Sequence, residues 1–124
     1  LAEYALTKRE CIIGRDDMAD IVIKDNYVSK LHAMLQLYSN ALVLLDLNST
    51  NGTIVNSVET PKKVLRNNDI ISLGNHRLKI ENLPSVSQAM AERIRAADTL
   101  ILKNLDDIRR KRARHNIVAL RHRQ

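Results

Sequence analysis

The chain has 124 residues, a single cysteine, no phenylalanine or tryptophan, and a formal net charge of +6. A lone cysteine excludes an internal disulfide and favours a reducing compartment, and no apolar run approaches the roughly 18 residues of a membrane span. We therefore expect a cytoplasmic protein whose core is built from aliphatic side chains.

The basic surplus lies in one part of the chain. Residues 1–84 hold ten basic and ten acidic side chains, whereas residues 85–124 hold ten basic and four acidic ones. Two segments of different physical character are the simplest explanation of this division. The sequence therefore predicts a neutral domain over residues 1–84 and a basic extension over residues 85–124.

The neutral part has the pattern of short β-strands. Residues 33–38 alternate with a period of two, as expected of a strand with one face in a core. Asn51-Gly52 favours a hairpin turn, because both residues tolerate positive φ. Many short strands between turn formers predict an antiparallel β-sandwich or barrel. The apolar runs that we expect to form other strands are 11–13, 21–23, 42–45, 70–73 and 76–80.

The periodicity changes after Pro84. Ser85 or Ser87 is suited to cap a helix, and Gln88 stands three residues after Ser85, as in a capping box. An apolar stripe predicts one amphipathic helix from about residue 86 to 114, where a cationic cluster suits the negative end of the helix. The stripe consists of Met90, Ile94, Ala97, Ile101, Leu105 and Ile108.

Three short polar segments interrupt the apolar runs of the neutral part: Gly14-Arg15, residues 29–32 and residues 46–53. Together they supply a guanidinium, an ammonium, hydroxyls and a side-chain amide from separate turns. Taken singly, they are ordinary features: a surface arginine, a turn serine, a core histidine and a plain hairpin. Taken together, they suit a phosphate group, because guanidinium offers a planar fork and hydroxyls add further hydrogen bonds.

In order and spacing, the Gly-Arg, Ser-x-x-His and Asn-Gly-Thr segments resemble the forkhead-associated (FHA) family, a module that recognises phosphothreonine peptides, over roughly residues 3–83. The resemblance implies an antiparallel β-sandwich that binds an extended peptide at its loop tips. It implies that the phosphate is held by four side chains, those of Arg15, Ser29, Lys30 and Thr50. Asn51 would then bond the main chain of the ligand.

The resemblance also implies residues that support this site. They are two glycines on tight backbone paths, a histidine that braces the serine loop and a loop-stabilising asparagine, namely Gly14, Gly52, His32 and Asn56. Tyr27 lies near where family members read the third residue after phosphothreonine. The family usually begins with an apolar strand, whereas residues 1–6 resemble its second strand. An absent first strand would leave backbone groups open to another chain.

We expect a phosphothreonine-dependent binding module of bacterial type that acts in Ser/Thr-kinase signalling. We expect no enzyme, because no acid is placed to complete a triad with Ser29 and His32. No metal or cofactor is expected, because the four histidines lack metal-ligand spacing and no glycine-rich nucleotide loop is present.

The basic extension supports an alternative of another class. It is a phosphate-independent scaffold whose helix dimerises or binds nucleic acid or an anionic membrane. Packing on the sandwich or on a second copy is favoured over anion binding, because the stripe is long and the cationic cluster lacks base-stacking aromatics. A dimer through the open strand edge and a linker to another domain also stay open.

Overall fold

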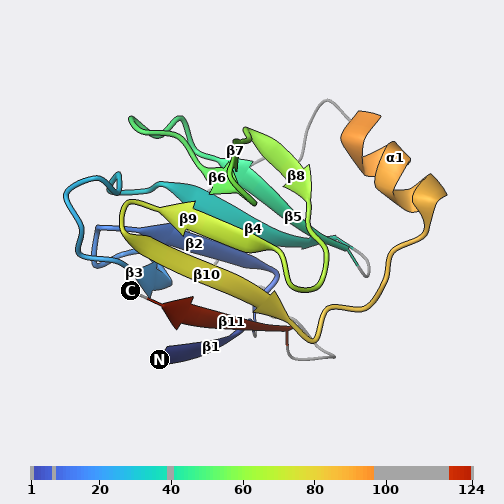
Figure 1. Ribbon diagram of the computed structural model, residues 1–124, viewed down its shortest axis with the longest axis horizontal. Helices are drawn as coiled ribbons and strands as arrows, with labels where there is room; N and C mark the ends of the chain where they lie inside the picture. The colour runs from blue at the N-terminus through green and yellow to red at the C-terminus, as the bar shows by residue number, and fades with distance from the viewer. Residues whose placement is uncertain (1, 7, 39–40, 97–117, 124) are drawn as a thin grey trace.

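Two β-sheets pack face to face in a computed structural model of the protein, which describes residues 2–6, 8–38, 41–96 and 118–123 (Figure 1). One sheet has six strands in the order β1 (Ala2–Leu6), β11 (Val118–Arg123), β10 (His76–Glu81), β9 (Ile70–Leu73), β6 (Ile54–Val55) and β7 (Val58–Glu59). The other has five, in the order β3 (Ile21–Val22), β2 (Glu10–Gly14), β4 (Ala33–Tyr38), β5 (Ala41–Asp46) and β8 (Lys62–Val64). The predicted β-sandwich is confirmed.

The core lies between the two sheets and is aliphatic, as the composition predicts. In β10 the side chains alternate, so that Leu78 and Ile80 are buried while Arg77 is exposed. The alternation predicted for β4 places Leu35 in this core, but the other face is not exposed along its whole length. Met34 on that face is fully buried in a small second cluster with Ile12 and Ala19. Both faces of β4 are therefore covered near the middle of the sheet.

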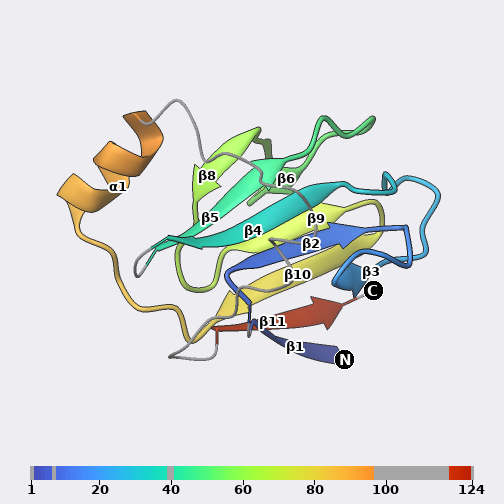
Figure 2. The same ribbon diagram turned by 180° about the vertical axis from the view of Figure 1, so that it is seen from behind.

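Strand β11 lies between β1 and β10 and is antiparallel to both, so that Leu120 stands opposite Tyr4 on one side and Ile80 on the other. Figure 2 shows the same order from behind. The sequence places residues 118–123 in the basic extension, beyond the helix predicted to end near residue 114, whereas the structure makes them a strand of the sandwich. From the sequence we expect the backbone groups of residues 1–6 to be open to another chain. In the structure one edge of β1 is paired with β11 of the same chain.

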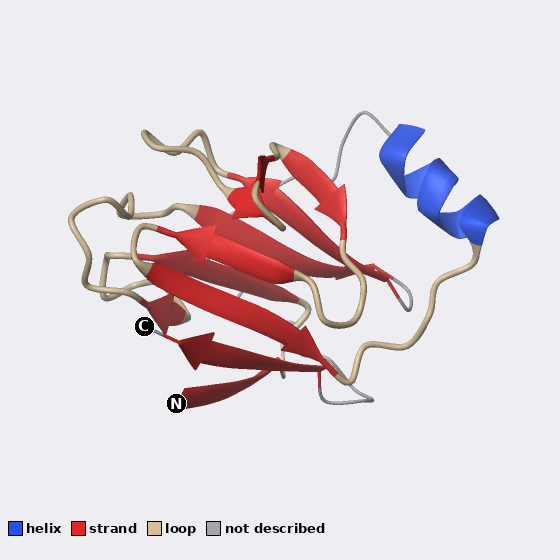
Figure 3. Cartoon of the chain, viewed as in Figure 1, coloured by secondary structure: helices blue, strands red, loops and turns tan. Residues whose placement is uncertain are grey.

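One helix, α1 (Gln88–Ala96), covers part of the outer face of the five-stranded sheet (Figure 3). Ser87 caps it, since its Oγ accepts the backbone N–H of Met90 at 3.1 Å. Near the last described turn of the helix, Lys62 Nζ donates to the Ile94 carbonyl at 2.9 Å. The side chain of Ile94 is buried against Ala41, Val43 and Val64.

The rest of the predicted helix lies outside the described residues, together with the cationic cluster at 109–114 and the stripe from Ala97 onward. Within the described part of the chain, no helix has the length and apolar character that crossing a membrane requires.

The position of β11 predicts a large effect of shortening its buried side chain. Leu120 is 0% exposed, so we expect Leu120→Ala to lower the free energy of unfolding by about 3 kcal/mol, through lost burial and the cavity left behind. Urea unfolding followed by circular dichroism measures this. Val58→Ala is the matched control, because Val58 is 63% exposed and should lose little. Equal stability of the two variants would contradict the placement of β11 in the core.

Candidate functional site

Three connections at one end of the sandwich carry the predicted site residues (Figure 1). Arg15 follows the last residue of β2, and Tyr27, Ser29 and Lys30 lie between β3 and β4. Thr50 and Asn51 lie between β5 and β6. Hydrogen bonds join the three connections, as described below, so these side chains form one site although their positions along the chain are far apart.

Arg15 is held by the connection between β3 and β4. Its backbone N–H donates to the Ser29 carbonyl at 3.0 Å, and its side-chain Nε donates to the Val28 carbonyl, also at 3.0 Å. The Nε bond orients the plane of the guanidinium. The two terminal nitrogens are the pair that makes bidentate contacts with an oxyanion such as phosphate.

His32 joins two connections of the site from inside the protein. Its side chain is 0% exposed, and its Nδ1 accepts the backbone N–H of Ser29 at 3.0 Å. Because Nδ1 accepts, the proton of the neutral ring is on Nε2, which donates to the Gly52 carbonyl at 2.8 Å. Ser29 Oγ in turn accepts the backbone N–H of Thr50 at 3.0 Å. The serine and threonine of the predicted phosphate pocket are therefore adjacent.

Asn51 and Tyr27 meet at the outer rim of the site. Asn51 Nδ2 donates to the Tyr27 carbonyl at 2.8 Å, which leaves the Asn51 carbonyl oxygen as an acceptor. The Tyr27 side chain is 63% exposed. Its backbone N–H donates to Asp25 Oδ1 at 2.8 Å, so this acid fixes the backbone beside the rim.

Both predicted glycines occupy positions that a side chain would disturb. A Cβ atom at Gly14 would overlap the Lys30 carbonyl oxygen, which is backbone and has little freedom to move aside. Gly52 has φ +82°, in the left-handed region that favours glycine, and an added Cβ would contact the Glu59 side chain. These two glycines allow the connections of the site to approach each other closely.

An acid that the sequence reasoning missed organises the connection between β5 and β6. Asp46 accepts hydrogen bonds from the Ser49 backbone N–H at 3.0 Å, from the Ser49 hydroxyl, and from the Thr53 hydroxyl at 2.6 Å. Burial raises the pKa of Asp46, but the bonds from Ser49 and Thr53 outweigh burial, and the pKa is lower than usual. The Asp-x-x-Ser spacing is the signal that could have indicated this turn.

Asn56 lies apart from the other predicted residues. It occupies the β6–β7 turn with φ 50°, and its Nδ2 donates to Asp69 Oδ1 at 2.9 Å. Its Oδ1 accepts the backbone N–H of Ile70 at 3.0 Å. These bonds fix the turn against the start of β9, and among the described residues no hydrogen bond joins Asn56 directly to Arg15 or Ser29.

Arg15 and Lys30 line an open hollow of about 410 Å³. Asp16, Asp17 and Lys24 line it as well. Asp17 is paired with Lys24 at 2.7 Å, and Asp16 Oδ1 accepts the backbone N–H of Met18 at 2.7 Å. Within the described residues, neither Arg15 nor Lys30 takes part in an ion pair. The lining of the hollow therefore carries three basic and two acidic side chains, and this net positive charge gives the hollow an affinity for anions.

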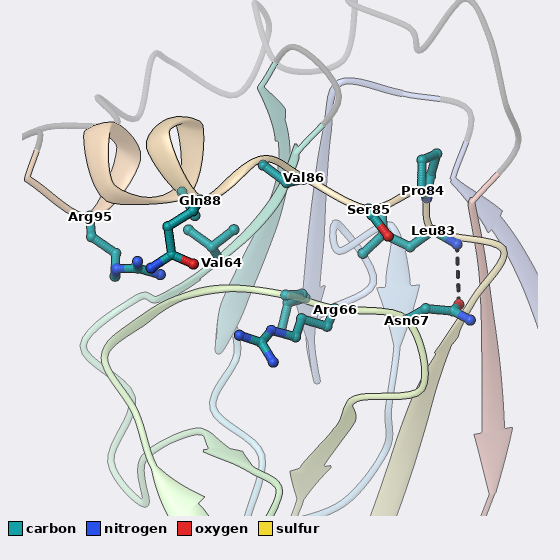
Figure 4. A pocket seen from close by; sticks show the side chains of 11 residues that line it. Val64, Arg66, Asn67, Leu83, Pro84, Ser85, Val86, Gln88 and Arg95 are labelled. Carbon is teal, nitrogen blue, oxygen red and sulfur yellow. Dashed lines mark hydrogen bonds between the residues drawn. The ribbon is translucent and has the colours of Figure 1, made fainter.

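A second hollow, of about 440 Å³, lies between α1 and the connection that joins β8 to β9 (Figure 4). Arg66 and Arg95 line it, and nearby the Leu83 backbone N–H donates to Asn67 Oδ1 at 3.2 Å. It contains none of the residues that the sequence predicts for the phosphate site.

The arrangement of Ser29 and His32 differs from that of a catalytic pair. His32 bonds the Ser29 backbone N–H and not the hydroxyl that would attack a substrate. The Cys11 thiol is buried, and burial together with Asp20 raises its pKa to about 12, which keeps it protonated. Among residues that the structure describes, no three His, Cys, Asp or Glu side chains group as metal ligands would.

A search against family models matches residues 11–74, just over half of the chain, to the FHA domain. The chain belongs to the FHA domain family. Among curated relatives, FhaA of Mycobacterium tuberculosis is 36% identical over 75 residues, which are 60% of this chain and 14% of that protein. The glycogen accumulation regulator GarA of the same species is 38% identical over 65 residues, which are 52% of this chain and 40% of GarA.

Solved FHA domains share the fold of this one. A domain from a structural and functional analysis of phosphothreonine-dependent FHA interactions has a TM-score of 0.62 and 34% identity, covering 66% of this chain and 85% of its own. The FhaA FHA domain, solved with the intracellular domain of Rv3910, has a TM-score of 0.57 and 36% identity. The match covers 60% of this chain and 81% of the FhaA domain chain. The chain spans less than half the length of the curated relatives FhaA and GarA.

The buried imidazole predicts a measurable loss of stability in His32→Ala. The variant leaves the Ser29 N–H and the Gly52 carbonyl without their partner, and we expect unfolding to become easier by about 2–4 kcal/mol. Urea unfolding at pH 7 is the measurement. Asn26→Ala, an exposed change beside the same site, is the control. A loss no greater than that of the control would show that the two bonds contribute little.

The lowered pKa of Asp46 predicts a pH-dependent contribution to stability. A carboxyl whose folded pKa is depressed stabilises the fold above its unfolded pKa, about 3.9, and this contribution is lost as pH falls through the folded pKa. Urea midpoints between pH 6 and pH 3 should fall more steeply for the unmodified FHA domain than for Asp46→Asn. Parallel curves would refute this role of Asp46.

Proposed function

We propose that this FHA domain binds a segment of another protein in which a Ser/Thr kinase has phosphorylated a threonine. The observation that carries the proposal is the hollow beside Arg15 and Lys30, whose two cations have no acidic partner among the described residues. A phosphothreonine carries about −1.5 to −2 charges at pH 7 and three strong acceptor oxygens. An anion of this kind provides the charge that the hollow lacks.

The neighbouring groups suit the rest of such a ligand. Ser29 Oγ accepts the Thr50 backbone N–H, so the two residues are adjacent, and their hydroxyls offer further donors to phosphate oxygens. The side-chain Oδ1 of Asn51 remains available to accept a backbone N–H of an extended peptide. Its Nδ2 is already bonded to the Tyr27 carbonyl. The exposed Tyr27 ring offers an apolar surface to a residue after the phosphothreonine.

The solved relatives support this interpretation. One was analysed for phosphothreonine-dependent FHA interactions, and another, EmbR of Mycobacterium tuberculosis, was solved with a low-affinity phosphopeptide. The alternative, a phosphate-independent scaffold that acts through the basic extension, is not favoured. Its cationic cluster at 109–114 lies outside the described residues, whereas the family membership concerns the sandwich itself.

Titration of a degenerate phosphothreonine-peptide library tests the proposal. We expect dissociation constants near 1 μM, about −8 kcal/mol, for the best peptides and no binding of their unphosphorylated forms. Arg15→Ala should weaken binding by about 10- to 100-fold, since hydrogen bonds to charged groups contribute about 1.5–3 kcal/mol. Isothermal calorimetry on single peptides gives the constants.

Arg77→Ala is the matched control, because it removes the same charge from an exposed position on β10. Its affinity should stay within about twofold of the unmodified domain, since charges far from the ligand are screened by salt. Binding that ignores phosphorylation, or that Arg15→Ala and Arg77→Ala weaken equally, would reject a specific phosphothreonine site.

A further inference from the structure

A chain of polar contacts runs from the C-terminal strand towards the peptide site. His122 on β11 lies beside Tyr4 of β1, with its Nδ1 at 3.3 Å from the tyrosine hydroxyl. His122 Nε2 is 2.7 Å from His76 Nδ1 on β10, and His76 Nε2 is 3.5 Å from Asp25 Oδ2. Figures 1 and 2 both show the end of β11 close to β3, which precedes Asp25.

The contacts fit a single direction of hydrogen bonding when both histidines are neutral. The Tyr4 hydroxyl donates to His122 Nδ1, and His122 Nε2–H donates to His76 Nδ1. The proton of His76 is then on Nε2, which faces the Asp25 carboxylate. Each ring nitrogen thus has one partner, and two imidazoles from different strands are held together within the sandwich.

Asp25 continues the chain into the site. Its Oδ1 accepts the Tyr27 backbone N–H at 2.8 Å, and its Oδ2 lies 3.3 Å from the Asn75 backbone nitrogen. The Tyr27 carbonyl then accepts the Asn51 amide at 2.8 Å. The side chain of Asp25 is only 9% exposed, so this path is partly shielded from water. The position of the Tyr27–Asn51 rim therefore depends on where Asp25 is held.

We propose that His122 and His76 are positioning residues for the phosphopeptide site, and that docking of the strand β11 and binding of the peptide stabilise each other through Asp25. This proposal rests on the proposed function. Neither histidine touches the hollow beside Arg15, so their effect is indirect. Coupling between two sites is reciprocal in free energy, so a bound peptide also holds β11 more firmly.

The imidazole pair makes the coupling sensitive to pH. A single added proton is tolerated, because one ring then donates to the other, but two protonated rings present N–H groups to each other across 2.7 Å. The groups that face His122 are Tyr4, His76 and, beyond it, Asp25. Burial lowers the pKa of His122, and the charge of His76 lowers it further. The pair therefore stays intact at neutral pH and separates in acid.

Three variants of the full chain test the proposal against the best phosphothreonine peptide of the library. At pH 7.5 we expect His122→Ala to weaken binding by about fivefold, at the low end of typical coupling between sites. His122→Gln should bind nearly as well as the unmodified chain, because an amide keeps the hydrogen bond to His76. Between pH 7.5 and 5.5 the unmodified chain should lose about fivefold more affinity than His122→Gln.

Arg121→Ala is the matched control on the same strand. Arg121 pairs with Glu3 at 3.0 Å and Glu81 at 3.2 Å. Its loss removes two part-exposed ion pairs that contribute little to the docking of β11, and it leaves the histidine contacts in place. We expect its affinity to match that of the unmodified chain. An equal loss in Arg121→Ala and His122→Ala, or identical pH profiles of His122→Gln and the unmodified chain, would overturn the proposal. The titration of the phosphate itself cancels in this comparison, because every variant binds the same peptide.

Amide hydrogen exchange without peptide separates this proposal from the proposed function. The N–H groups of Tyr27 and Asn75 face Asp25, and we expect both to exchange faster in His122→Ala than in Arg121→Ala. Faster exchange in a protein that binds no phosphopeptide would support the structural link between His122 and Asp25 but reject the proposed function, and with it the coupling to a peptide. Unchanged exchange together with unchanged peptide affinity would reject the coupling alone.

Discussion

The site depends on one buried imidazole more than on any residue that faces solvent. His32 is 0% exposed, and its ring joins Ser29 to Gly52, while its backbone N–H donates to the Ile13 carbonyl at 2.8 Å. Burying the imidazole nitrogens without these hydrogen bonds would lower the stability of the fold, because the nitrogens would lose their bonds to water and gain none in return. The result is a pair of loops fixed before any ligand arrives, which lowers the entropy lost on binding.

The sandwich beneath the loops is held together by residues from both ends of the chain. β11 pairs with β1 and β10, and Leu120 fills the same core as Leu78. On the other face of β11, Arg121 pairs with acids of both neighbouring strands. Strand pairing across this separation in sequence carries a large loop-closure entropy, which burial of apolar surface and paired backbone groups must offset. The N-terminal strand is thus stabilised by the C-terminal one.

The parts of this structure that the sequence predicts are those with a local signal. Period-two alternation indicates β4 and β10, and Ser87 marks the start of α1. β11 has no such signal, because Leu120 is followed by Arg121 and His122, and its apolar neighbours come from strands far away in sequence. Asp25 and Asp46 were missed for a similar reason: a carboxylate that accepts backbone N–H groups looks like any surface acid until the turn around it is known.

The charge of the site follows from which side chains are paired, not from composition. Residues 1–84 hold equal numbers of basic and acidic side chains, and by that count the domain should have no preference for anions. The fold nevertheless creates a local excess of positive charge at the site. Asp17 is paired with Lys24, whereas Arg15 and Lys30 have no ion-pair partner among the described residues. Coulomb energies fall with distance and are screened by salt over about 8–10 Å, so a ligand in the hollow responds mainly to the three basic and two acidic side chains that line it. A domain with equal numbers of basic and acidic side chains can therefore bind a doubly charged phosphate when the packing of its loops gathers more basic than acidic side chains around one hollow.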